Sequence, residues 1–295
     1  MNYQQTYLNS LIGRSTSTKR NCRQSLKDFV KTTGAPLAEM TTASISKWFQ
    51  HLEGRGVSNT FMLQHKANLA SFLRWSCNGV AAVPPDKKAH FEKVLKSLDA
   101  ILDIRPEAKE KKKLTLTLAH TEDILKAIAK ALKEHPKSLS LYRDRAIYLL
   151  LRSSLLRCGE LCSIKPSGLD FKENRLTVQG KGLGRGKVRT VWMSKAASNA
   201  LQEWIKIGNI RFDDRIFSVT TDAIRKNLRK WLLRAGIDTP GISPHAFRHL
   251  GIDTMDKKGL PMAAMMSQSG HSELSSFQRY LHGSLGRKDF EKVGL

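Results

Sequence analysis

The feature that most constrains the fold is a break near residue 105, where apolar residues stop and charges take over. Residues 104–114 read IRPEAKEKKKL, a proline followed by a charge run with almost nothing to bury. Such a stretch is typical of a linker between domains. The chain has 295 residues, 40% of them hydrophobic, which is enough for two separate cores. We therefore predict two domains, residues 1–104 and 115–295, joined by a linker over residues 105–114.

The chain is strongly basic, with 50 Lys and Arg against 26 Asp and Glu and a formal net charge of +24. Residues 1–110 hold 16 basic and 9 acidic residues, and residues 111–295 hold 34 and 17, so both parts are basic. This balance indicates a polyanionic partner contacted by two domains, with nucleic acid as the leading candidate. The linker is then either a solvated spacer or a basic strap along the phosphate backbone.

An anionic membrane is the less favoured partner. No apolar run approaches the roughly 20 residues of a spanning helix, and the start MNYQQTYLNS has no signal-peptide core. We expect a cytoplasmic, nucleoid-associated protein.

The four cysteines predict neither a disulfide framework nor a metal site. Cys22, Cys77, Cys158 and Cys162 are few and scattered, and no second Cys or His pair follows the last two at zinc spacing. We expect free, largely buried thiols and no cofactor.

Residues 1–104 predict a unit of four amphipathic helices. Ser17 is expected to cap the first helix, which ends before Gly34, and Thr42 opens the second. Ser58 is expected to cap a longer third helix, and the fourth follows Pro85.

Residues 115–295 predict a mainly helical domain with a small β-sheet. Helices are expected near 121–134, at 143–156 and at 221–236. The strand-like stretches NRLTVQG and VRTVWM flank the glycine-rich segment KGLGRGK, which predicts a β-hairpin with a long tip.

Two motifs place arginines at helix ends. In LLRCGELCSI, Glu160 lies three residues after Arg157, so its carboxylate can orient the guanidinium. In SPHAFRHLGIDTM, Ser243 is the expected N-cap, Pro244 the first helical residue, and the helix runs toward Gly259. His245 and Arg248 then share one face beside the free N–H groups of the first turn, where an anion binds favourably. Each motif alone also fits a merely structural pair or a capped surface helix.

Two further segments carry reactive side chains. Lys181 or Lys187, on the hairpin tip, can reach into a DNA groove, although a solvated turn explains the segment equally well. In SGHSELSSFQRYLHG, His271 follows a glycine and Tyr280 lies nine residues later, on an expected short helix. Taken singly, both side chains also fit packed or surface aromatics.

All four motifs, in this order on one basic domain, resemble the tyrosine recombinase family of phage integrases and Xer-type and Cre-like enzymes. The resemblance rests on Arg157 within RCGEL, the hairpin lysine, the HxxRH block at 245–249, and GH followed by Tyr280. The segment HLEGRGVSNTFMLQHKANLASFLRWS is similar to the family's helical core-binding (SAM-like) domain. Two departures are a long hairpin and LLR in place of the usual GLR before Arg157.

The resemblance implies that Tyr280 attacks a DNA phosphorus to form a 3′-phosphotyrosyl bond. Arg157 and Arg248 would stabilise the pentavalent transition state through their fork-shaped donors. Lys181 would protonate the departing 5′ oxygen, with Lys187 as its competitor; Lys181 is preferred because it directly follows the strand-like NRLTVQG.

The remaining roles are also implied by the resemblance. His245 would serve as acid or base for the tyrosine, and His271 would hydrogen-bond the phosphate. Glu160 and His249 would support these groups without touching the substrate. No metal is required, because arginines supply the positive charge that a divalent ion supplies in many nucleases.

Recombination further implies a homotetramer on two DNA sites, each a short inverted repeat, with the two domains forming a C-shaped clamp on DNA. The tail after Tyr280 would dock into a neighbouring protomer through Leu281, Leu285, Phe290 and Val293, although a frayed terminus is the simpler alternative. Because only a short segment precedes the first expected helix, we expect the simple type of recombinase, without an additional arm-binding domain. The alternatives are a type IB topoisomerase, which shares the side-chain chemistry, and a catalytically silent basic DNA-binding protein.

Overall fold

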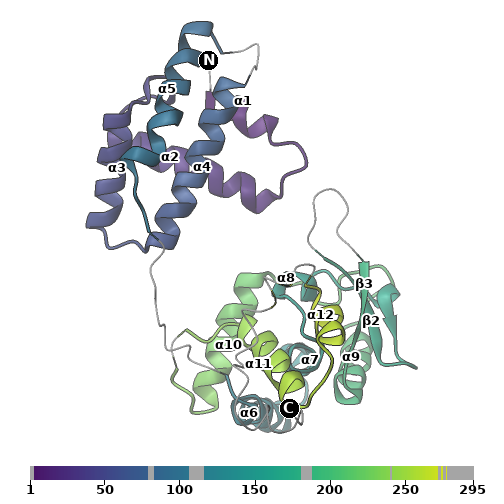
Figure 1. Ribbon diagram of the computed structural model, residues 1–295. Coiled ribbons are helices and arrows are strands. Elements are labelled where there is room, and N and C mark those ends of the chain that lie inside the picture. Colours follow the sequence, from purple (N-terminus) through teal and green to yellow (C-terminus); the bar gives the residue numbers. More distant parts are fainter. Residues whose placement is uncertain are drawn as a thin grey trace, which may run out of the picture. The chain divides into compact units, whose positions relative to one another are not determined.

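The computed structural model describes residues 3–78, 83–105, 116–180, 188–239 and 241–271, together with Leu274 and Phe277. The chain divides into two compact units, Met1–Lys111 and Lys112–Leu295 (Figure 1). Most of the predicted linker lies outside the described residues.

The N-terminal unit consists of helices and short turns. Its α-helices are α1 (Tyr3–Ser10), α2 (Thr16–Thr33), α3 (Thr42–Gly54), α4 (Asn59–Cys77) and α5 (Pro85–Ile101). The last four correspond to the predicted helices, and α1 is an addition that sequence reasoning missed. The cap of α2 is Ser15, whose side chain accepts from the backbone of Thr18, so the prediction of Ser17 is wrong by half a turn. Ser58 caps α4 as predicted.

Helix α1 is held by an aromatic core. The Tyr7 ring packs edge-on against Phe72, and its hydroxyl donates to the Ser71 hydroxyl at 2.8 Å. Phe29 and Trp48 pack edge-on deeper in the same core. These contacts explain why a short polar helix forms where its sequence pattern gives little signal, since tertiary packing supplies most of a short helix's stability.

The C-terminal unit is mainly helical, with a small sheet at one side (Figure 1), which confirms the predicted mainly α fold class. Its helices are α6 (Leu118–Glu134), α7 (Leu139–Ser154), α8 (Cys158–Leu161), α9 (Lys195–Ile207), α10 (Thr221–Arg234), α11 (His245–Lys257) and α12 (Met262–Ser269). Its strands are β1 (Leu169–Asp170), β2 (Arg175–Gln179) and β3 (Val188–Trp192). Helix α7 packs against α6, α9 and α11 and buries apolar side chains on most of its surface.

The sheet is antiparallel in the order β1-β2-β3. Leu176 pairs with Val191, and both side chains are buried, whereas the pair Gln179 and Val188 faces solvent. The predicted hairpin is therefore present in its two strands. Its tip, residues 181–187, lies outside the described residues.

Helix α11 differs from its prediction at the start. It begins at His245, and Pro244 is its N-cap rather than its first residue. Ser243 contributes its carbonyl, which accepts from Ala246 at 2.8 Å, and no side-chain cap bond is present at this helix start. The helix ends at Lys257, just before Gly259 with φ of 74°, as predicted.

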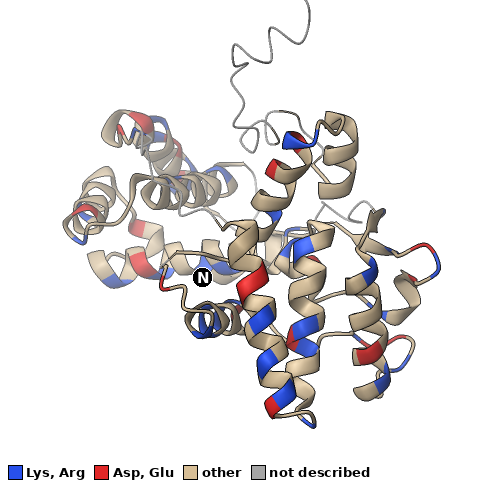
Figure 2. Ribbon diagram, turned by 90° about the horizontal axis from the view of Figure 1, so that it is seen from below, with Lys and Arg blue, Asp and Glu red and all other residues tan. Residues whose placement is uncertain are grey.

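Basic positions are spread over helices of both units, as Figure 2 shows. All four cysteines are free thiols, as predicted, but only Cys22 is buried, and the other three are half-buried, so the prediction of largely buried thiols is wrong. Within the described ranges, every helix is too short or too polar to cross a membrane.

Candidate active site

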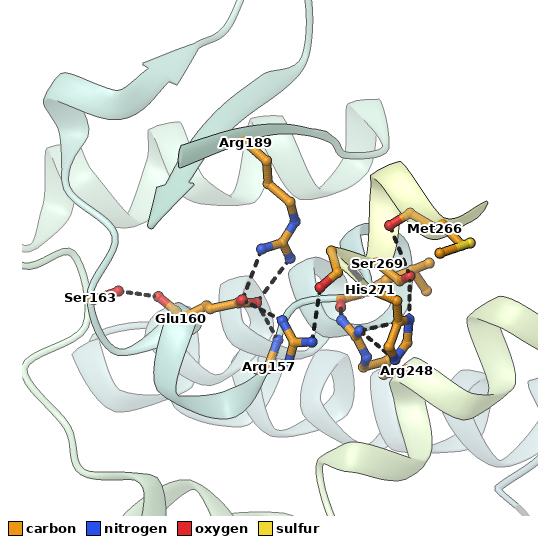
Figure 3. A network of polar contacts seen from close by, with 10 residues as sticks. Arg157, Glu160, Ser163, Arg189, Arg248, Met266, Ser269 and His271 are labelled. Atoms are coloured by element: carbon orange, nitrogen blue, oxygen red, sulfur yellow. Dashed lines mark hydrogen bonds and ion pairs between the residues drawn. The ribbon is translucent and has the colours of Figure 1, made fainter. Parts of the chain in front are cut away.

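The first arginine of the site is positioned by the end of α7. The chain leaves α7 at Ser154, turns at Leu155 and places Arg157 at the N-cap of α8. The Arg157 guanidinium donates to Glu160 Oε1 at 2.9 Å and to the Gly270 carbonyl at 3.0 Å (Figure 3). Two segments distant in sequence thereby fix one cation.

Glu160 is buried and fully engaged by donors. Its Oε2 accepts from the Arg157 backbone N–H at 2.8 Å, and Arg189 of β3 donates to both oxygens, at 2.8 and 3.0 Å. Burial raises the pKa of the Glu160 carboxyl. The bonds from Arg189 and Arg157 and their charges outweigh that effect, so the pKa lies below its ordinary value. Glu160 is therefore a carboxylate at neutral pH.

Arg248, the second arginine, is fully buried in α11. Its Nη1 donates to the Leu155 carbonyl at 2.7 Å, and its Nη2 lies 3.2 Å from the His271 ring. Gly270 therefore holds one arginine, and the next residue contacts the other. The two guanidinium groups are brought together by the turn that follows α12.

His271 follows Gly270, whose left-handed conformation ends α12. Its Nδ1 lies 2.8 Å from the Ser269 hydroxyl. Burial, followed by the positive charges of Arg248 and Arg157, lowers the pKa of His271 to about 4. His271 is thus neutral at pH 7 and can offer a hydrogen bond without adding charge.

His245 lies in the same electrostatic field. Burial is the largest cause that lowers its pKa, and Arg248 and Arg157 are the next two. Its ring packs edge-on against that of His249, with centroids 4.9 Å apart. The imidazole of His245 is therefore also neutral at pH 7.

The described part of the site has more positive than negative charge. Arg157, Arg189 and Arg248 face a single carboxylate, Glu160, and the two histidines are neutral. Within a partly water-excluded site, a surplus of this kind attracts an anion, and fork-shaped guanidinium groups suit a phosphate.

The structure thus brings together Arg157, Glu160, Arg248 and His271, with His245 in the same field and His249 against it. Lys181, Lys187 and Tyr280 lie outside the described residues.

Sequence reasoning missed one member of the cluster, Arg189. The signal that could have found it is the alternation of VRTVW, which turns Arg189 to the same inward face as Val191. An inward-facing arginine on a half-buried strand needs a buried partner.

The C-terminal unit thus combines helices, a three-stranded sheet and a cluster of arginines and neutral histidines. The family model of the Phage integrase family matches residues 114–286, and the chain belongs to this family. The predicted family, fold class and enzyme class are therefore confirmed.

Relatives of known name agree with this membership. The tyrosine recombinase XerC of Corynebacterium efficiens is 26% identical over 290 residues, covering 95% of this chain and 86% of the relative. XerC of Haemophilus influenzae is 33% identical over 148 residues, covering 48% of this chain and 49% of the relative. These matches favour recombination over the topoisomerase and the silent DNA-binding protein.

Solved structures show the same fold. The Tn1549 transposon integrase in complex with transposon right end DNA has a TM-score of 0.69 at 18% identity and covers both chains fully, 100% of each. The XerH recombinase bound to palindromic difH substrate, a post-cleavage complex, has a TM-score of 0.67 at 15% identity. The match covers 94% of this chain and 78% of XerH.

Proposed function

We propose that the protein is a site-specific recombinase that cuts and rejoins DNA strands through a covalent bond between Tyr280 and a 3′ phosphate. One observation carries the proposal: Arg157 and Arg248 converge, with His271, on a site that has a surplus of positive charge. The relatives named XerC and the structures of related enzymes with DNA support DNA as the substrate.

The chemistry follows from these groups. Arg157 and Arg248 donate to the non-bridging oxygens, whose charge grows in the transition state. The Tyr280 oxygen bonds to phosphorus while the bond from phosphorus to the 5′ oxygen breaks, and a proton passes to that oxygen. Reversal with a different 5′ hydroxyl joins new partners, and the phosphotyrosyl ester conserves the energy needed for rejoining.

The neutral histidines fit their proposed tasks. His245 can accept the phenol proton of Tyr280 because its lowered pKa leaves the ring uncharged at pH 7. His271 can donate one hydrogen bond to the phosphate. Glu160 keeps Arg157 in place, and His249 packs against His245.

Lys181 is the proposed donor to the leaving 5′ oxygen, in preference to Lys187. Lys181 is preferred because it directly follows the sequence segment NRLTVQG, which contains β2. Lys181→Ala is expected to slow cleavage by about 10²-fold or more, and Lys187→Ala by less. A reversed order would give the role to Lys187.

We further propose a homotetramer on two DNA sites, in which each C-terminal tail binds a neighbouring protomer. The catalytic unit has an apolar groove of about 610 Å³ between α7 and α11, lined in part by Leu149, Leu155, Leu250, Met255 and Leu260. The tail's apolar residues, Leu281, Leu285, Phe290 and Val293, provide matching chemistry. Truncation after Gly283 is expected to leave DNA binding intact and prevent assembly of paired sites, as judged by gel mobility.

The N-terminal unit, residues 1–104, is proposed to bind DNA and to close a C-shaped clamp with the catalytic unit through the linker at 105–114. Its positive net charge supports this role. One protomer would then bind each half-site of a short inverted repeat, and the enzyme would associate with the nucleoid.

The deciding experiment maps covalent protein–DNA adducts across the DNA of origin and then tests the recovered site as a nicked suicide duplex. Wild type should form a protein–DNA adduct that survives denaturation, and Tyr280→Phe should bind the duplex without forming one. An adduct from Tyr280→Phe moves the nucleophile elsewhere. Binding by wild type without any adduct would leave a DNA-binding protein.

A further inference from the structure

Leu155 stands in a backbone conformation that suits glycine. Its φ is 55° and its ψ is 24°, the left-handed region, and its side chain is 1% exposed. A side chain at this conformation brings its Cβ close to neighbouring backbone, whereas glycine adopts it freely. A leucine here therefore needs a reason that compensates for this strain.

The backbone of Leu155 does not supply that reason. The turn directs its carbonyl toward Arg248, which donates to it at 2.7 Å. A glycine in the same conformation would present the same carbonyl. The benefit must come from the side chain.

The side chain of Leu155 forms a small apolar cluster apart from the main core, together with Ile252, Met265 and Phe277. It crosses α11 at Gly251, where an added Cβ would lie 2.0 Å from Leu155 Cδ2. Gly251 thus provides the space through which Leu155 reaches the cluster. A glycine inside a helix is otherwise unfavourable, so the two residues form a matched pair.

Phe277 connects this cluster to the chemistry. Its ring is fully buried and lies against His271, with centroids 5.2 Å apart. Phe277 precedes Tyr280 by three residues. Through Phe277, the cluster therefore contacts His271, and it includes a residue close in sequence to the proposed nucleophile.

We propose that Leu155 is a positioning residue with two tasks: its carbonyl orients Arg248, and its side chain anchors the Phe277 segment that carries Tyr280. One residue then sets the distance between the cation and the nucleophile-bearing segment. The importance for cleavage rests on the proposed function, but the anchoring of Phe277 does not.

The anchor is tested first without DNA, by unfolding in urea. Gly251→Ala should destabilise the wild-type protein because the new methyl group meets Leu155. In a Leu155→Gly background the same change should stabilise, since alanine exceeds glycine in a helix interior. Equal signs in the two backgrounds would overturn the pairing of Leu155 with Gly251.

Hydrogen exchange of the full-length protein tests the link to Phe277. The peptide that spans Leu274 and Phe277 should exchange faster in Leu155→Gly and in Gly251→Ala, and at nearly the wild-type rate in Leu155→Met. Leu201→Ala, which opens a comparable gap in the main core on α9, is the matched control and should leave this peptide unchanged under native conditions. If the exchange rate of this peptide changes only in proportion to the overall stability of each variant, Leu155 does not anchor Phe277.

Cleavage of the mapped site tests the consequence. At saturating DNA, Leu155→Gly should slow adduct formation at least about tenfold, since small displacements of reacting groups are costly. Its affinity for DNA should stay within about twofold of wild type, because phosphate contacts that set affinity are retained. Leu155→Met should restore the rate. Loss of affinity with an unchanged rate would overturn the positioning role. If wild type forms no adduct but the exchange pattern is as expected, the proposed function is wrong, and the anchoring of Phe277 by Leu155 still stands.

Discussion

Among the described residues of the C-terminal, catalytic unit, the carboxylates of Asp144 and Glu160 are buried, and they differ in what surrounds them. Asp144 on α7 accepts from Asn227 at 2.8 Å, from the Trp231 indole at 2.9 Å and from Arg143 at 3.0 Å. Glu160 accepts from two arginines and from a backbone N–H. Both are almost completely hidden, at 2% and 4% exposure.

The difference lies in charge. Around Asp144, neutral donors and one arginine balance one carboxylate, and the result fastens α7 to α10. Around Glu160, two arginines share one carboxylate, and the nearby Arg248 donates to the Leu155 carbonyl and contacts the His271 ring. A buried ion pair alone says little about function. The excess of positive charge distinguishes the cluster around Glu160, which we propose binds an anion, from the cluster around Asp144, which stabilises the fold.

Removing an arginine from each cluster is expected to give the largest difference between the surroundings of Glu160 and Asp144. Arg157→Ala is expected to reduce adduct formation by about 10²- to 10³-fold, the usual effect of removing one donor to a developing oxyanion. Arg143→Ala, the matched change at Asp144, is expected to lower stability and leave the cleavage rate of the folded protein within about twofold. Single-turnover cleavage of the mapped site measures both, and similar losses in both variants would erase the distinction.

Carboxylate removal tests the surplus directly. Glu160→Gln leaves the partly buried Arg157 and Arg189 without the counter-charge of a buried carboxylate and is expected to cost about 3 kcal/mol, because removing one partner of a buried ion pair is strongly destabilising. Asp144→Asn should cost about 1–2 kcal/mol, since its neutral donors keep an oxygen acceptor. Urea unfolding gives both values.

Sulfate sharpens that measurement. It stabilises most proteins by exclusion from their surface, so the readout is the difference between the two variants at equal ionic strength. Sulfate should recover more stability in Glu160→Gln than in Asp144→Asn, because only the former leaves a pocket for an anion. An equal gain in both would argue against an anion site.

The same contrast explains what could be predicted from sequence. Arg157 and Glu160 are three residues apart, and their pairing follows from helix geometry. Arg189 lies 29 residues beyond Glu160, and Gly270 lies 113 beyond Arg157. Those contacts depend on how β3 and α12 pack, which no local pattern specifies.

Helices followed the same rule. Strong apolar periodicity predicted α2 to α7 and α10. The single turn of α8 lies within the motif that contains Arg157. Helices α9 and α12 were not predicted: α9 buries mainly small side chains such as Ala197 and Ala200, and α12 is short. The conformation of Leu155, the first residue of LLR, could not be predicted either, because a left-handed backbone is invisible in a residue that rarely adopts it.

Arg189→Lys is a gentler test of the Glu160 cluster. Lysine keeps the positive charge but loses the fork that meets both carboxylate oxygens. We expect a loss of about 1 kcal/mol in stability and a cleavage rate lower by about tenfold, through looser placement of Arg157. Arg143→Lys should cost a similar or smaller stability without the rate effect. A normal rate in Arg189→Lys would separate Arg189 from the chemistry.

The smallest effect distinguishes two histidines, the buried His65 in the N-terminal unit and the half-buried His271 in the C-terminal unit. Burial is the main cause that lowers the pKa of both His65 and His271, and for His271 it brings the value to about 4. Because that value lies below the ordinary 6.5, His271 contributes stability that is present above pH 6.5 and lost as the pH falls toward 4. The charged or titratable groups that further depress it are Arg248, Arg157, His245 and Arg189.

A bound anion should change the pKa of His271 and leave that of His65 unchanged. Sulfate or DNA phosphate in the site offsets the arginine charges and should raise the pKa of His271, whereas His65 responds to Asp28 and Arg55 in its own unit and should not change with sulfate. Imidazole carbon–proton NMR signals, followed against pH with and without sulfate, measure both rings in one sample. If sulfate changes the pKa of neither His271 nor His65, the arginines do not bind an anion beside His271. The surroundings of Asp144 and Glu160 would then differ in structure but not in anion binding.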